Sequence, residues 1–366
     1  TSSGTVMKDE RIIASIDDGH HNGKGQLIGK GGDVTSFISP TLIMHGAYSS
    51  FGSASQNPDV AEFKTANADG QDEYFTVFQR LRYGEAEHMI DTQNQDYLLS
   101  EANRVFVHSM LHRMGLSGQK VELVTTLPIR RYFKKSGNLD QDYIDARNEN
   151  LKKSVIPMNG DEPVEIVSVT QMPESFVSYL SLLIKYQNNK GQGRISIDSE
   201  YLNKDILILD FGGQTLDVGV VSRGQLQTKK CETFEGVGML AVNELLADEL
   251  RSYRKNLDRL ELDNIISTGK FRPSKQSDAE HDVSNIVQSC INEVYTNGIE
   301  KIKARFPMHD FHLILGAGGP LVSISHLVKQ LIPEIQIVED PLMSNSNGGL
   351  KYLLKKKAKA SDSEIA

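Results

Sequence analysis

The chain has 366 residues, of which 24% are charged and 39% hydrophobic, with a net charge of −8 and a pI near 5.7. This composition is typical of a globular protein, and the length predicts two domains or one bilobed molecule. The acidic balance argues against direct, sequence-independent DNA binding, which needs a basic face. Cys231 and Cys290 are too few for a disulfide framework, and no apolar run reaches the ~20 residues of a membrane span. We therefore expect a cytoplasmic protein with no membrane partner.

The first lobe is predicted to cover residues 11–187, after a disordered N-terminus (1–10) whose opening TSSGTV resembles a tag remnant. It begins with an apolar run, Ile12–Ile16, that ends in two aspartates and turns on a glycine. Such a run predicts a buried strand, and the glycine lets backbone N–H groups approach an anion. A second strand is expected near Gln26, which makes the pair a hairpin.

Periodicity predicts the rest of this lobe. Residues 33–84 alternate short strand-like runs with polar loops, which indicates a small, variable subdomain. Apolar residues at three- and four-residue intervals predict a helix over 98–114. On it, His108 and His112 lack the glutamate of a zinc-protease motif, so we expect two partly exposed helix residues. Strands are expected over 121–125 and 164–170 and a helix over 176–184, and the stretch 134–154 is polar and charged.

A polar, glycine-containing loop at 188–193 marks the predicted start of the second lobe, which covers 188–340. Its strands are expected over 205–210, 215–221, 312–315 and 335–338, and its helices over 239–251, 286–294 and 299–306. A helix at 341–357 is expected to return to the first lobe, followed by a charged, disordered tail at 358–366. Strands that alternate with helices predict an α/β protein with largely buried sheets.

The most informative feature is a repeat. Ile206–Asp210 and the Phe-Gly-Gly turn after it have the same pattern as the segment from Ile12 to Gly19. A carboxylate at a strand end repels a phosphate unless a cation lies between them. Paired Asp-Gly turns therefore predict a Mg²⁺-nucleotide held from two sides. The first turn alone would indicate only a tight hairpin.

Two other phosphate-binding motifs fail at the first turn. Gly19-His-His-Asn-Gly-Lys24 is one residue short of the P-loop spacing, and Gly25 stands where Ser or Thr should follow the lysine. The third glycine of a Rossmann fingerprint would fall at Gly29, and no helix is expected after it. The spacing argues against both motifs.

Five motifs in chain order resemble those of the actin-like ATPases, the superfamily of actin, Hsp70 and the sugar kinases. They are Ile16-Asp17-Asp18-Gly19-x-x-Asn22-x-Lys24, Thr126-Leu127-Pro128, Met172-Pro173-Glu174-Ser175, Leu209-Asp210-Phe211-Gly212-Gly213-x-Thr215-Leu216-Asp217 and Gly316-Ala317-Gly318-Gly319. Each motif is weak alone, but the ordered set is specific, and it is most similar to the plasmid-partitioning filament proteins of the ParM/StbA type. The resemblance runs from about Ile12 to the final helix. It implies an actin/Hsp70/hexokinase-like bilobed fold, with two related lobes around a nucleotide cleft.

The resemblance also implies roles for the site residues. Asp17 and Asp210 would hold a hydrated Mg²⁺. The phosphate-binding residues would be Asp18, Gly19, His20, Asn22, Lys24, Gly212, Gly213, Gln214 and Thr215. The loop of Gly316, Ala317, Gly318 and Gly319 would lie against the purine and ribose, although the same residues would also suit a plain strand-to-helix turn.

The same family places a catalytic carboxylate at Glu174. This residue follows a proline at the start of a helix, from where it would position or activate the attacking water. The alternative role is a first-turn glutamate that only complements the helix dipole.

The chain departs from the family at His20, where a Ser or Thr is usual. Imidazole can also donate a hydrogen bond, but its charge changes near neutral pH. We therefore predict that nucleotide affinity or assembly is more pH-sensitive here than in relatives with Ser at this position, which a titration of assembly from about pH 6 to pH 8 would test.

The resemblance implies a nucleotide triphosphatase that polymerises into filaments with ATP and Mg²⁺ and hydrolyses the ATP to control filament dynamics. Such filaments would segregate plasmid DNA through a ParR-like DNA-binding adaptor on a centromere-like site, which fits the acidic pI. GTP stays open as a second nucleotide. A sugar or metabolite kinase of the same superfamily and a non-catalytic cytoskeletal scaffold are the alternative functions.

Overall fold

The computed structural model describes residues 12–29, 31–48, 58–82, 85–94, 96–189, 192–276 and 278–363. The predicted tag remnant and disordered N-terminus (1–10) lie outside the described residues, as do positions 364–366 of the predicted tail.

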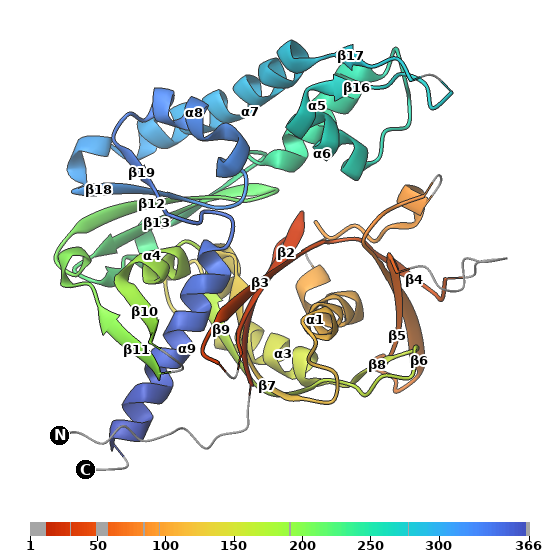
Figure 1. Cartoon of the computed structure of the whole chain (residues 1–366). Coiled ribbons are helices and arrows are strands. Elements are labelled where there is room, and N and C mark those ends of the chain that lie inside the picture. Colours follow the sequence, from red (N-terminus) through yellow and green to blue (C-terminus); the bar gives the residue numbers. More distant parts are fainter. Residues whose placement is uncertain are drawn as a thin grey trace.

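Two sheets of the same topology form the centre of the molecule (Figure 1). The first, in the order β3-β2-β1-β7-β9, consists of Val34–Pro40, Asn22–Ile28, Ile12–Asp18, Lys120–Leu127 and Glu165–Pro173. The second, in the order β14-β13-β12-β18-β19, consists of Gln225–Leu226, Thr215–Ser222, Asp205–Phe211, Leu313–Ala317 and Ile335–Ile337, with β15 (Glu232–Glu235) also paired to β13. In each sheet the strand that ends in aspartate pairs antiparallel with the next strand and parallel with a later one. The repeat seen in the sequence is therefore a repeat of the fold.

Helices cover both faces of each sheet (Figure 1). The middle layer, between the sheets, is α4 (Phe176–Leu183) and α9 (Ser344–Ser363), which pack on each other. The outer layer of the first sheet is α1 (Glu101–Arg113) and α3 (Gln141–Lys152). The outer layer of the second sheet is α5 (Met239–Leu250), α6 (Arg259–Thr268), α7 (Ser284–Arg305) and α8 (Leu321–Leu331).

Alternation along the central strands explains the three layers. In β12, Leu207, Leu209 and Phe211 belong to the outer core of the second lobe, whereas Ile206 and Ile208 belong to the middle layer. Successive side chains of a strand point to opposite faces, so a continuous apolar run fills two cores at once.

Smaller elements complete the two lobes. A four-stranded sheet, β4-β6-β5-β8, curves around α1 opposite the main sheet (Figure 1). Its strands are Ile43–His45, Asp72–Phe78, Val60–Ala66 and Val155–Pro157. The predicted subdomain over 33–84 thus contributes β3 to the main sheet and takes β8 from far along the chain. The remaining elements are α2 (Ile129–Tyr132), the hairpins β10–β11 (Ile184–Asn189, Gln192–Ile197) and β16–β17 (Lys270–Phe271, His281–Asp282), and short 3₁₀ turns at Glu85–His88, Tyr97–Leu99, Ser199–Tyr201, Thr228–Lys230 and Met308–Asp310.

Several local predictions were wrong. The stretch 188–193 was expected to be a loop, but its described residues belong to the β10–β11 hairpin. Helices α3 and α6 were not predicted, and the two helices expected over 286–306 are the single helix α7. Helix α9 extends through Ser363, beyond the point where the disordered tail was expected to begin. None of the helices in the described ranges combines the length and apolarity that crossing a bilayer requires.

His108 was expected to be partly exposed, and this was also wrong. The side chain is fully buried under α3, and its Nε2–H donates to the Leu151 carbonyl at 2.9 Å. Burial lowers the pKa of His108 to about 4. The folded protein thus holds a neutral imidazole in its core.

This burial predicts a loss of stability in acid. The folded pKa lies below the unfolded value of about 6.5, so as the pH falls through 6.5 only the unfolded chain takes up the proton. We expect the free energy of unfolding to fall by about 3 kcal/mol on this account by pH 4. His108→Gln should flatten the decline measured by urea unfolding between pH 7 and pH 4.5, relative to the exposed control His309→Gln. Equal slopes in the two variants would contradict this expectation.

Candidate functional site

The ends of β1, β9 and β12 converge on one cavity of about 60 Å³ between the two main sheets. Its acidic lining consists of Asp17, Asp18, Glu174, Asp210 and Asp217. A second cavity of about 190 Å³ lies beside it, and Lys24, Gly213 and Leu342 line both. The residues that the sequence singled out from both halves of the chain therefore meet in one place.

The two hairpins present matching positions to this cavity. Asp17 stands opposite Lys24 across β1 and β2, and Asp210 stands opposite Asp217 across β12 and β13. Lys24 Nζ lies 3.2 Å from Asp17 Oδ2, and Thr126 Oγ1 donates to Asp17 Oδ1 at 3.1 Å. Burial opposes the charge on Lys24, but Asp17, Asp210 and Glu174 together raise its pKa. A permanent cation therefore lies among the acids of the cavity.

Asp210 is held by donors from two other segments. Ser175 N–H donates to its Oδ2 at 3.1 Å, and Asn345 Nδ2 donates to the same oxygen at 3.0 Å. Burial, with Asp17 and Asp217 nearby, raises the pKa of Asp210 to about 6. The carboxylate thus lacks a counter-charge that would match its burial.

Glu174 follows β9 and precedes α4, and it lines the same cavity. Burial raises its pKa well above the ordinary value, and the charges of Asp217, Asp17, Asp210 and Asp18 add to the shift. Burial likewise raises the pKa of Asp217, which shares a hydrogen bond with Glu174.

This concentration of acids suits a divalent cation. A cation between Asp17 and Asp210 would offset the burial and the mutual repulsion that raise the pKa values of Asp210 and Glu174. Within the described ranges, no three His, Cys, Asp or Glu side chains lie close enough to bind a metal directly. Asp17 and Asp210 could hold a hydrated Mg²⁺, whose other ligands would come from water and phosphate.

Asp18 differs from its neighbour. Its two carboxylate oxygens accept hydrogen bonds from Arg147 Nη2 at 2.7 Å each, and Asn103 Nδ2 and Thr125 Oγ1 donate as well. Burial opposes the charge, yet these donors lower the pKa of Asp18. The family role of Asp18 in phosphate binding would therefore fall to its backbone, because its side chain is occupied inside the first lobe.

His20 lines the first cavity, and its surroundings there affect the predicted pH dependence of nucleotide affinity or assembly. Burial lowers the pKa of His20, and this effect outweighs the charge of the nearby Asp18, which raises the pKa. The structure thus shifts the titration expected of this ring towards more acidic pH.

Most of the other predicted site residues line one or both cavities. Gly19, Gly212, Gly213, Gln214, Thr215 and Gly318 line the first, and Asn22, Gly213 and Gly319 line the second. Gly316 and Ala317 lie in β18 and line neither cavity. Of this glycine loop, only Gly318 and Gly319 therefore line the two cavities.

Sequence reasoning missed several lining residues. Asp217 was part of a motif but received no role, and Arg130, Ser344 and Asn345 were not noticed. Asp263 on α6 also lines the second cavity, and the start of helix α6 could have been predicted from the sequence. Its capping box, Asp258 with Glu261, is the acid-x-x-Glu pattern that marks a helix start.

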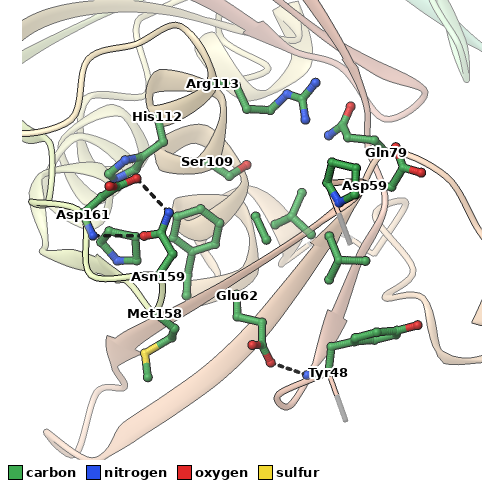
Figure 2. A pocket seen from close by; sticks show the side chains of 16 residues that line it. Tyr48, Asp59, Glu62, Gln79, Ser109, His112, Arg113, Met158, Asn159 and Asp161 are labelled. Carbon is green, nitrogen blue, oxygen red and sulfur yellow. Dashed lines mark hydrogen bonds between the residues drawn. The ribbon is translucent and has the colours of Figure 1, made fainter. Parts of the chain in front are cut away.

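A larger cavity of about 620 Å³ lies elsewhere, between α1 and the small sheet. Figure 2 shows the side chains that point into it, among them Glu62, His112, Arg113 and Asp161. Tyr48 and Pro58, which flank a stretch outside the described residues, both line it. It lies away from the paired Asp-Gly turns, and we assign it no ligand.

The chain is similar to known proteins in both sequence and fold. Residues 12–183, just under half of the chain, match the family model described as plasmid segregation protein ParM, N-terminal. The sequence matches no curated protein.

Among solved structures, the chain is similar to the ParM of a 15-stranded filament from Clostridium botulinum. It is 18% identical, with 95% of this chain and 100% of that one covered and a TM-score of 0.71. The archaeal actin homolog Ta0583 is 14% identical, with 94% and 99% covered and a TM-score of 0.69. ParM of Bacillus thuringiensis with ATP is 14% identical, with 96% and 100% covered and a TM-score of 0.63. The first lobe therefore matches the ParM N-terminal family model, and nearly the whole chain has the actin-like fold of these structures.

Proposed function

We propose that this protein is a cytoplasmic ATPase that assembles into filaments with ATP and Mg²⁺ and disassembles after hydrolysis. The observation that carries the proposal is the meeting of two aspartate-ended hairpins, one from each lobe, with Glu174 at one cavity. Bound Mg²⁺ would neutralise phosphate charge beside Asp17 and Asp210. Lys24 would add a fixed cation, and Glu174 would orient the attacking water.

Filament formation follows from lobe closure. Both hairpins reach the same phosphates only when the lobes are together, and closed lobes offer complementary surfaces for a head-to-tail contact that does not close on itself. The filament and nucleotide-bound ParM structures support this reading by analogy of fold. The likeness to the ParM family and the acidic pI further support plasmid segregation through a ParR-like DNA-binding adaptor.

Contacts across the cleft set how readily nucleotide exchanges. His21 Nε2 lies 3.0 Å from Asp263 Oδ1, which joins the first hairpin turn to α6 of the other lobe. Gln214 Nε2 donates to Gln93 Oε1 at 3.4 Å, and Arg130 pairs with Glu235. The cavities of about 60 and 190 Å³ are smaller than the ~300 Å³ and more of a typical ligand site, so the lobes must part for a nucleotide to bind.

Removing the His21–Asp263 pair should therefore speed exchange. We expect Asp263→Ala to release a fluorescent nucleotide up to about fivefold faster, because this partly buried pair is worth no more than about 1 kcal/mol. Lys270→Ala is the matched control, since it removes an ion pair with Asp282 that lies within one lobe. Equal release rates from the two variants, measured by stopped flow, would contradict the role of this pair.

Light scattering and phosphate release, followed together after adding ATP or GTP with and without Mg²⁺, test the proposed function. We expect scattering to rise with nucleotide and Mg²⁺ and to fall as phosphate appears. Assembly without phosphate release would indicate a scaffold instead. Turnover without assembly that needs a sugar cosubstrate would indicate a kinase.

A further inference from the structure

Ser175, directly after Glu174, has a backbone conformation that non-glycine residues rarely adopt. Its φ is 61° and its ψ −49°, and in the described part of the chain only Arg223 also combines a side chain with positive φ. Phe176 N–H donates to the Glu174 carbonyl at 2.7 Å. These angles and this bond define a γ-turn of the strained, positive-φ type. Such strain persists only where surrounding contacts enforce it, and it concentrates at functional sites.

Contacts from both lobes enforce the turn. From the first lobe, the Leu127 carbonyl accepts from Glu174 N–H at 2.9 Å. From the second lobe, Asp210 Oδ2 accepts from Ser175 N–H at 3.1 Å. The Ser175 side chain is fully buried against Gly219 of β13, where a Cβ would lie 2.4 Å from Ser175 Oγ. The N–H groups of Glu174 and Ser175, which flank the Glu174 α-carbon, are thus bound to different lobes.

We propose that Ser175 is a positioning residue, whose enforced γ-turn fixes the Glu174 carboxylate relative to Asp210. The inference rests on the proposed function, in which Glu174 orients water and Asp210 serves the metal. Because the Ser175 N–H uses an Asp210 oxygen, a shift of Asp210 as the lobes move is passed directly to the backbone of Glu174. The contacts from both lobes keep the strained turn from relaxing into a helical start, which would aim Glu174 elsewhere.

Ser175→Gly tests this, because glycine adopts positive and negative φ with similar ease and so removes the restriction while keeping the N–H. We expect the hydrolysis rate at saturating ATP to fall about tenfold, since small misplacements of a catalytic group are costly. Nucleotide affinity should stay within about twofold, because the turn gives the nucleotide no side chain, and the Tm should not fall. Arg223→Gly is the matched control, because it relieves the other positive φ on a turn at the far end of β13.

Gly219→Ala perturbs the same turn from the second lobe, because the added Cβ would collide with the Ser175 side chain. We expect it too to slow hydrolysis more than it weakens nucleotide binding. A Ser175→Gly protein that hydrolyses ATP like the wild type would overturn the inference, as would one whose affinity and Tm fall along with its rate. A wild-type protein that hydrolyses neither ATP nor GTP would instead overturn the proposed function.

Discussion

Replacing Glu174 with glutamine is expected to lower the rate of ATP hydrolysis by about 10²- to 10⁴-fold, the usual contribution of a positioned acid or base. Glutamine has nearly the same shape but cannot accept a proton from water. Nucleotide binding should persist, because Asp17, Asp210 and Lys24 are untouched. Filaments should then form with ATP and fail to disassemble, which light scattering would record as a plateau without decay.

The same substitution should stabilise the protein without nucleotide. Burial and the neighbouring carboxylates raise the pKa of Glu174, so its ionised form is disfavoured in the fold. A group with a raised folded pKa costs stability as the pH rises through the unfolded value, about 4.3 for glutamate, towards the raised folded value. Glutamine removes that cost, so we expect a higher Tm at pH 7 together with lost activity, as is common where a site stores unfavourable charge.

Glu165→Gln provides the control, because Glu165 begins the strand that Glu174 follows but faces solvent beside Lys120. It should leave both rate and Tm close to wild type. If Glu174→Gln hydrolysed ATP at the wild-type rate, the assignment of Glu174 would be wrong, whatever its Tm.

The central strands and the positions of their terminal aspartates were predictable because they follow local rules. An apolar run that ends in aspartate and glycine fixes both a doubly buried strand and the carboxylate at its end, so Ile12–Asp18 and Asp205–Phe211 were found from pattern alone. Their convergence needed the resemblance to a family, because no local rule says that two turns almost 200 residues apart will meet.

The failures also have physical causes. Helix α3 was missed because its apolar positions, Ile144 and Leu151, are sparse and its buried face includes Arg147. Helix α7 was divided in two at Gly298, a glycine that breaks the pattern but is needed where the helix meets Val237, since a Cβ there would lie 2.3 Å from Val237 Cγ1. The γ-turn at Ser175 could not be predicted, because the contacts that enforce it come from distant strands.

Arg147→Met is expected to cause the largest loss of stability, about 3–5 kcal/mol, the typical cost of breaking one side of a buried ion pair. Arg147 is 0% exposed, and its guanidinium binds both oxygens of Asp18 and the Thr126 carbonyl. Methionine fills part of the volume but leaves a buried carboxylate without its counter-charge. Urea unfolding at pH 7 should record the loss, whereas Lys152→Met, which breaks an exposed pair on the same helix, should change stability by at most about 0.5 kcal/mol.

The double variant Asp18→Asn with Arg147→Met separates charge from packing. It removes both charges, so it should recover at least half of the lost stability if the uncompensated carboxylate is the cause.

The pH dependence of stability gives a second check on the role of the Asp18–Arg147 pair. In the wild type the pKa of Asp18 is lowered by folding. Its contribution to the free energy of unfolding is therefore complete above the unfolded pKa near 3.9, and it is lost as the pH falls through the folded pKa. Without Arg147, burial would raise that pKa, and protonation would remove the penalty, so the gap between Arg147→Met and wild type should narrow from pH 7 to pH 5. A gap that stayed constant, with no recovery in the double variant, would mean that Arg147 acts through packing alone.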